Sequence, residues 1–156
     1  MTNNNNYRVE FVNKPEAADV LLLWIKPTGN ALSGQQGAPI SISLSKCGVD
    51  IDYVNKLSGK KPVILVINYT NPWVIDEIYN DKTSKNIIGV LATFGTTPDA
   101  LLDVITGKFN PSGKMPFSTP ISDEAVENNK EDVPGYMEGN SYALFNNNEG
   151  LSYTLK

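Results

Sequence analysis

Three short, uninterrupted apolar runs constrain the fold of this chain more than any other feature. They are Val20–Ile25 (VLLLWI), Val63–Ile67 (VILVI) and Ile87–Ala92 (IIGVLA), each five or six residues long. A run of this length without polar alternation is typical of a strand buried on both faces, as in parallel sheets, and it is too short for a buried helix. The sequence therefore predicts three strands of a mostly parallel sheet.

Helical patterns separate and follow the predicted strands. Apolar residues recur at helical spacing in Val49–Leu57, and Asn71–Tyr79 and Thr97–Ile105 each begin with a capping residue followed by proline. Gly107 stands where a helix C-terminus favours glycine. Alternation of strands and helices predicts right-handed crossovers and helices on both faces of the sheet. We therefore expect a three-layer α/β/α sandwich.

The last third of the chain has a different character, because prolines and glycines interrupt it repeatedly. In Asn110–Phe117, Pro111 followed by Gly113 predicts a turn in which Gly113 has a positive φ. Ser122–Asp132 contains five acidic residues and predicts an exposed loop or short helix. Gly150–Leu155 predicts a last strand, and Tyr7–Val12 predicts a short strand at the start of the chain.

Length and composition exclude several classes of protein. The 156 residues fit one domain, 1–156, and the net charge of −4 with 13 dispersed basic residues argues against a nucleic-acid partner. The longest apolar run is too short to cross a bilayer, and no secretory leader is recognisable at Met1–Asn6. We expect a soluble protein, either cytoplasmic or secreted within a longer precursor. Histidine is absent, and the single Cys47 is expected to be a buried thiol.

Six segments in order along the chain resemble those of one enzyme family. The segment NPSGKMP followed about 35 residues later by GLSYT is the most specific combination. The chain thereby resembles the C-terminal domain of family 3 glycoside hydrolases, the β-glucosidase family, whose C-terminal domain is an α/β/α sandwich of flavodoxin-like type. The matching segments are Ala17–Val20, Lys61–Val66, Ala100–Gly107, Asn110–Phe117, Asp132–Tyr136 and Glu149–Thr154.

The resemblance also implies which catalytic groups this chain lacks. In the family, the nucleophile is an aspartate on a separate N-terminal barrel domain, which we expect to be absent here. The acid/base of many members is a glutamate on a loop that corresponds to Lys26–Lys46, and this segment contains no Asp or Glu. An amide such as Gln35 cannot donate and recover a proton as a carboxyl group does. We therefore expect no catalytic residue, and neither a metal nor a cofactor.

Candidate ligand contacts follow from the predicted sheet. Open α/β sheets bind ligands beyond the carboxyl ends of their strands, where Lys26–Gly37, Asn68–Asn71 and Thr93–Thr97 are expected. These segments are rich in groups that can bind sugar hydroxyls. In contrast, Trp24 is expected in the core, and Trp73 is expected to pack its predicted helix. The substrate-binding candidates are Asn30, Gln35, Gln36 and Asn68.

Three functional hypotheses remain at this stage. The leading one is an accessory domain of a β-glucosidase-like glycoside hydrolase, inactive alone, whose partner is a barrel domain or a second copy in a homodimer. The alternative is a non-catalytic carbohydrate-binding or protein-interaction module. A flavodoxin-like nucleotide or flavin binder is disfavoured, because no glycine-rich phosphate loop follows the first buried strand.

Overall fold

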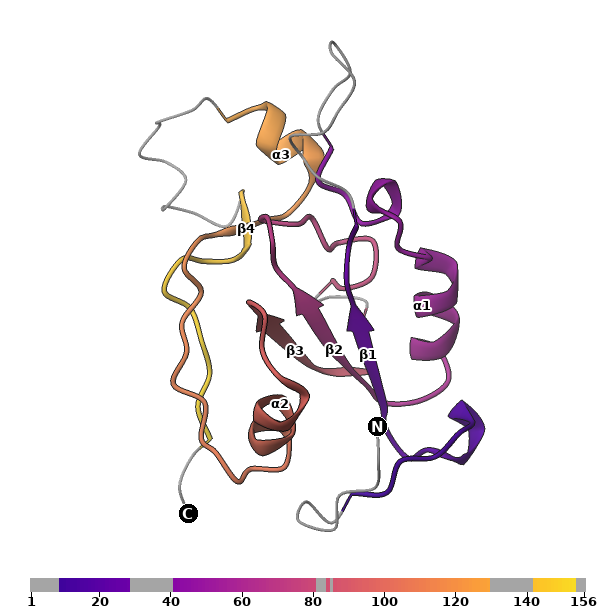
Figure 1. Cartoon of the computed structure of the whole chain (residues 1–156). Helices are drawn as coiled ribbons and strands as arrows, with labels where there is room; N and C mark the ends of the chain where they lie inside the picture. Colours follow the sequence, from indigo (N-terminus) through magenta and orange to yellow (C-terminus); the bar gives the residue numbers. More distant parts are fainter. Residues whose placement is uncertain (1–8, 29–40, 81–83, 85, 130–141, 154–156) are drawn as a thin grey trace.

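The computed structural model describes residues 9–28, 41–80, 84, 86–129 and 142–153, and its centre is a three-stranded parallel sheet. The strands are β1 (Leu21–Ile25), β2 (Val63–Asn68) and β3 (Ile87–Thr93), adjacent in chain order (Figure 1). All three strands predicted from the apolar runs are confirmed, as is the α/β class. The central position of β2 explains why its apolar run is the most deeply buried.

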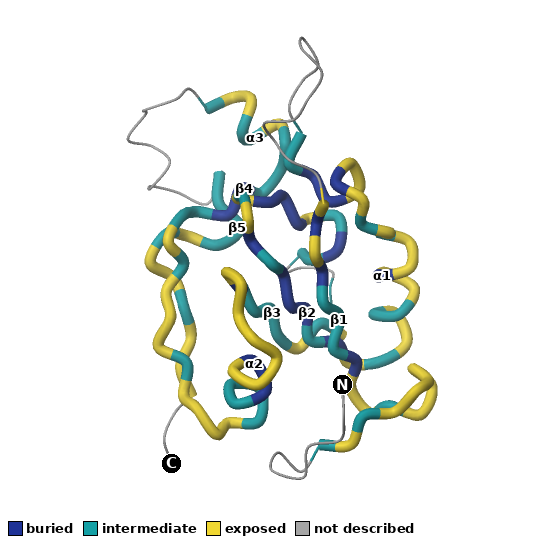
Figure 2. The backbone as a smooth tube through the Cα atoms, viewed as in Figure 1, coloured by how far each residue is buried: buried dark blue, intermediate teal, exposed yellow. Residues whose placement is uncertain are grey.

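Side chains of β2 alternate between two covered faces, as the pleat of a strand requires. Val63, Leu65 and Ile67 point to one face and belong to the main core cluster, together with Val54 of the helix α1 (Ile51–Ser58). Val66 points to the other face and is equally buried. Figure 2 shows β2 in dark blue between partly exposed neighbours. The sheet is therefore the middle layer of the domain.

The two main helices begin where the sequence predicts. Asp50 precedes α1, and its carboxylate accepts a hydrogen bond from the backbone N–H of Tyr53 at 2.9 Å. Thr97 caps α2 (Pro98–Ile105), and Gly107 follows that helix with a φ of 76°. Leu101 and Leu102 of α2 are buried outside the main core cluster. No helix among the described residues is long and apolar enough to cross a membrane.

The connection from β2 to β3 differs from the prediction, because the segment after Asn71–Pro72 is not a helix. Trp73, Val74 and Ile75 are consecutive and all buried, which extended backbone allows between two covered sides. The backbone N–H of Val74 donates to the carbonyl of Ile42, and Val74 forms a parallel β-bridge with Ser43. Pairing with this distant segment replaces the intrahelical hydrogen bonds, so the capping signal was misleading here.

A second, two-stranded antiparallel sheet lies beyond the main one. Strand β4 (Thr119–Pro120) pairs with β5 (Ala143–Phe145), and the short helix α3 (Asp123–Glu127) lies between them in the chain. The acidic segment therefore includes a short helix, as predicted. The predicted last strand is wrong in its described part, because Leu151–Tyr153 are not in a strand.

The start of the described chain has little regular structure. Val9 forms a single β-bridge, and Glu10–Val12 continue without strand pairing, so the strand predicted in that part is wrong. Two short 3-10 helices, η2 (Pro15–Ala17) and η3 (Ser45–Cys47), complete the elements. The ammonium group of Lys61 donates to the carbonyls of Glu16 and Ala18, which attaches η2 to the start of β2.

The motifs NPSGKMP and GLSYT lie side by side in the structure (Figure 1). The backbone N–H of Met115 donates to the carbonyl of Glu149 at 2.8 Å. The amide of Asn110 accepts from the backbone N–H of Tyr153 at 2.7 Å and donates to its carbonyl at 3.3 Å. The segment containing Gly113 therefore runs alongside its partner, and the positive φ predicted for Gly113 is not observed.

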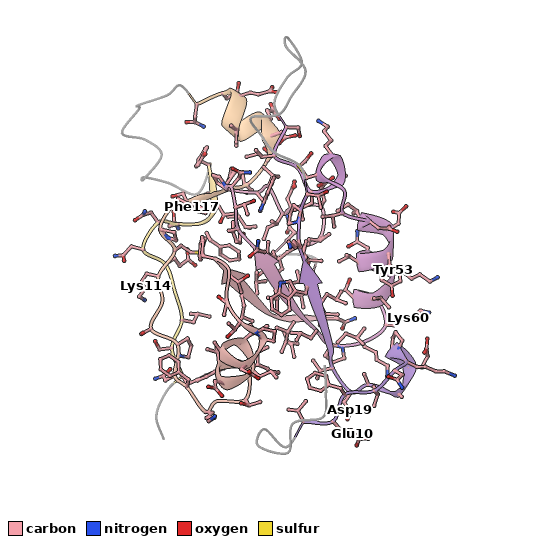
Figure 3. The ribbon with its side chains drawn as sticks, in the orientation of Figure 1. Glu10, Asp19, Tyr53, Lys60, Lys114 and Phe117 are labelled. Carbon is pink, nitrogen blue, oxygen red and sulfur yellow. The ribbon has the colours of Figure 1, made fainter. Side chains whose placement is uncertain are left out.

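Aromatic rings connect this C-terminal segment to the sheet. Phe117, labelled in Figure 3, lies 5.8 Å from the ring of Tyr69 and 6.0 Å from that of Phe94, measured between ring centroids. Tyr69 follows β2 and Phe94 follows β3, so the three rings meet beyond the carboxyl ends of these strands. Such ring pairs stabilise by about 0.5–1.5 kcal/mol each beyond their buried area.

The close approach of the two motifs gives a direct test of the packing. A Cβ atom at Gly150 would lie 2.4 Å from the carbonyl oxygen of Gly113, whereas a Cβ atom at Gly113 would meet open space. We expect Gly150→Ala to lower the free energy of unfolding by about 1–3 kcal/mol, because backbone must move to relieve the overlap. Urea unfolding of Gly150→Ala and of the control Gly113→Ala measures the difference. Equal stabilities of the two variants would contradict the pairing of the motifs.

Candidate functional site

A depression of about 510 Å³ lies at the carboxyl edge of the parallel sheet. Parallel strands end at the same edge, so residues from separate parts of the chain meet there. Trp24 and Lys26 come from the end of β1, and Asn68 is the last residue of β2. Gly95 and Thr96 come from the segment between β3 and α2. The site is therefore made by the ends of all three strands.

Asn68 lines the depression, and hydrogen bonds to its side-chain oxygen hold it in place. Its Oδ1 accepts from the backbone N–H of Gly95 at 3.3 Å and from the hydroxyl of Thr93 at 3.5 Å. Its backbone carbonyl accepts from the indole N–H of Trp73 at 3.2 Å. These contacts fix the orientation of the amide, and they leave its NH₂ group as the free half of the side chain within the described residues.

The sequence-predicted candidates have different positions relative to the described chain. Asn68 lines the depression, while Asn30, Gln35 and Gln36 lie outside the described residues. Lys26–Thr28, the described start of their loop, is at the carboxyl end of β1 as expected. The binding role of the four candidates remains a prediction.

Other residues of the depression were not singled out from the sequence. Lys26, Gly95 and Thr96 belong to segments that were expected at this edge, and their position directly after a strand was the available signal. Trp24 was expected in the interior, but it is only partly buried and lies outside the core cluster. Trp73 is fully buried, but the helix that it was expected to pack is not formed.

A second depression of about 340 Å³ lies between the end of α1 and the connection from β2 to β3. Its lining includes Asn55, Ser58, Asp76, Glu77 and Asn86. Two of these amides are already used by the fold: Asn55 donates to the carbonyl of Glu77 at 3.1 Å, and Asn86 donates to that of Ser58 at 2.7 Å. These hydrogen bonds hold α1 against the connecting segment, which gives the polar lining a structural role.

The acidic side chains near η3 and α3 also have partners within the fold. The carboxylate of Asp123 accepts from the hydroxyl of Ser41 at 2.9 Å and forms an ion pair with Lys46 at 3.6 Å. That of Glu77 accepts from the backbone N–H of Ser45 at 3.0 Å. Each contact joins elements that are distant in sequence. The arrangement gives these carboxylates a structural role in the fold.

Cys47 is buried, as the sequence predicts. Burial raises the pKa of its thiol above the ordinary value, and the carboxylates of Asp123 and Glu77 raise it further. A thiol with a raised pKa is a weak nucleophile, because the reactive form is the thiolate. Within the described residues, no group of three or more His, Cys, Asp or Glu side chains is arranged to hold a metal ion.

Fold and motifs together define an α/β domain with a ligand-sized depression at the carboxyl edge of its sheet. The model of the glycosyl hydrolase family 3 C-terminal domain matches residues 2–153, and the chain belongs to this family. The resemblance stated from the motifs is therefore confirmed.

Curated relatives show which larger proteins contain such a domain. A probable β-glucosidase C of Aspergillus flavus is 34% identical over 95% of this chain, which corresponds to 22% of that protein. The β-glucosidase C of Emericella nidulans is 33% identical over the same shares. A periplasmic β-glucosidase/β-xylosidase of Dickeya chrysanthemi is 28% identical over 79% of this chain and 19% of that protein. The chain thus spans about a fifth of the length of these relatives.

Asp76 gives a test of the electrostatics near η3 and α3. Burial, the neighbouring Glu77 and the more distant Asp123 raise the pKa of its carboxyl group above 3.8. The folded chain therefore keeps this proton to a higher pH than the unfolded chain, so stability is lost as pH rises from 3.8 through the folded pKa. We expect Asp76→Asn to raise the urea midpoint at pH values above that window and to leave it unchanged below it.

The matched control for Asp76 is Asp19→Asn. Asp19 is exposed and lies near the amino ends of the strands in Figure 3, far along the chain from the acidic side chains near η3. We expect its replacement to leave the pH dependence of the midpoint unchanged. A lower urea midpoint for Asp76→Asn than for the unaltered chain at neutral pH would contradict the raised pKa of Asp76.

Proposed function

We propose that this chain is a non-catalytic accessory domain of a β-glucosidase-type family 3 glycoside hydrolase, and that its carboxyl-edge depression contacts the carbohydrate. The observation that supports this function best is the position of Asn68. Membership of the family supplies the class of enzyme, and the end of the central strand supplies a fixed amide with a free NH₂ group. An oriented amide of this kind suits the recognition of a sugar hydroxyl.

The depression combines features that a sugar site needs. Trp24 presents a partly exposed aromatic side chain, and amphipathic rings of this type provide apolar contact together with a polar N–H group. Thr96 adds a hydroxyl, and Lys26 adds a flexible cation. The same edge is where open α/β sheets generally bind their ligands. Asn30, Gln35 and Gln36 follow β1 in the sequence, and we propose them as further contacts from the same loop.

A catalytic barrel domain is the partner that we propose first. The relatives named β-glucosidase are more than four times as long as this chain, since 149 aligned residues are 22% of their length. A retaining glycosidase needs two carboxyl groups about 5–5.5 Å apart. The segment that corresponds to the acid/base loop has no carboxyl group. The chemistry of hydrolysis therefore has to come from another domain or another chain.

The alternative function is a carbohydrate-binding or protein-interaction module that acts without any hydrolase. The absence of Asp and Glu from Lys26–Lys46 favours it over a catalytic role for this chain. The two hypotheses share the depression and differ in the partner. Binding of methyl β-D-glucoside to the isolated chain would agree with both, so the partner has to be tested separately by adding a barrel domain.

The proposed accessory role predicts that the chain alone has no hydrolytic activity. The purified chain is expected to show no hydrolysis of an aryl β-glucoside above the buffer background, because it lacks a pair of carboxyl groups that can act on the glycosidic bond. Release of the chromophore measures the rate. Turnover that survives repurification and disappears on replacement of an Asp or Glu of this chain would refute the accessory role.

A second copy of the chain is the other partner that we propose, and this partner predicts self-association. Five large apolar side chains of the second half are exposed among the described residues, and β3 is an edge strand of the described sheet with neither charge nor proline. Sedimentation at tens of micromolar is expected to give a dimer or a concentration-dependent average mass. A single monomeric species across that range would contradict the dimer. The exposed side chains are Ile88, Phe94, Phe109, Leu151 and Tyr153.

A further inference from the structure

The described side chains that line the depression at the carboxyl edge include several hydrogen-bond donors. Lys26 provides an ammonium group, and Trp24 provides an indole N–H. The acceptor oxygen of Asn68 is occupied by Gly95 and Thr93, so its NH₂ group is the half that remains for a ligand. Only the hydroxyl of Thr96 can act in both ways. A ligand that fits this set must supply acceptors.

Lys26 also has no acidic partner among the described residues. The ion pairs of the described chain join Lys46 to Asp123 and Lys108 to Asp103, and Lys26 belongs to neither. None of the described residues that line the depression is acidic. The loop that follows Lys26 cannot provide a counter-charge either, because residues 26–46 contain no Asp or Glu. The described lining of the depression is therefore positively charged, on a chain whose net charge is −4.

We propose that this depression recognises a sugar that bears a carboxylate, such as a hexuronic acid residue. The inference rests on the proposed carbohydrate contact and specifies the class of sugar. The carboxylate accepts from the ammonium group of Lys26, the NH₂ group of Asn68 holds an oxygen of the sugar, and the pyranose ring lies against Trp24. Hydrogen bonds between charged groups are about twice as strong as neutral ones, so the carboxylate sets the preference.

A matched pair of ligands tests the proposal. Methyl β-D-glucuronide and methyl β-D-glucoside differ only in the carboxylate that replaces the C6 hydroxymethyl group. Binding to the isotope-labelled chain is followed by amide and indole N–H chemical shifts. We expect the dissociation constant of the glucuronide to be lower by about tenfold, and the advantage to shrink as sodium chloride is added. Shift changes are expected at Trp24, Lys26 and Gly95.

Variants separate the charge from the rest of the site. Lys26→Gln is expected to make the two ligands bind equally. The control is Lys60→Gln, on an exposed lysine that Figure 3 places below α1. It is expected to keep the preference for the glucuronide. Asn68→Asp keeps the oxygen that accepts from Gly95 and adds a negative charge. Because this variant also removes the NH₂ donor, it is expected to weaken the binding of both ligands, and to weaken that of the glucuronide more. The larger loss for the glucuronide makes it a second variant if Lys26→Gln is unstable.

The outcomes distinguish this inference from the function on which it rests. Equal binding of both glycosides by the unaltered chain would overturn the carboxylate preference and leave the carbohydrate contact standing. Binding of neither would overturn the carbohydrate contact itself. Sodium acetate is the third ligand: binding as tight as that of the glucuronide would show that the depression selects charge alone, and would overturn recognition of a sugar.

Discussion

The pairing of β2 with a parallel neighbour on each side is the constraint on which the rest of this domain depends. Its backbone groups are satisfied by β1 and β3, and its side chains are covered on both faces. A strand in this position has to be apolar along nearly its whole length. The only polar residue of the strand, Asn68, is its last residue and stands at the edge where the other two strands also end.

The C-terminal third is attached to this sheet by a small number of specific contacts. Asn110 binds both backbone groups of Tyr153, and Phe117 packs against Tyr69 and Phe94. The two motifs that are most specific for the family, NPSGKMP and GLSYT, therefore stabilise each other through direct hydrogen bonds. Gly150 is needed because the facing backbone leaves no room for a Cβ atom. This packing, rather than any ligand, accounts for the residues of the NPSGK segment.

The carboxylates near η3 and α3 and the donors of the carboxyl-edge depression belong to different parts of the structure. Carboxylates near η3 and α3 join segments of the fold, while the carboxyl-edge depression has an amide, an ammonium group, a hydroxyl and an indole. Donors of this kind can orient a sugar, but none can act as the carboxyl acid/base of a glycosidase. Membership of the family is thus compatible with a domain that contributes contacts to a site whose reactive groups lie elsewhere.

The sequence by itself determined the elements whose signals are local. Burial on both faces made β1, β2 and β3 visible as apolar runs. Helical spacing of apolar residues located α1, and a capping residue followed by proline located α2. It also placed Asn68 and Lys26 directly after strands. Only the tertiary structure decided that Asn71–Tyr79 pairs with the segment at Ser43 rather than forming a helix, because that depends on a partner distant in the chain. It likewise decided that the oxygen of Asn68 is occupied and its NH₂ group free, since sequence spacing gives no orientation to a side chain.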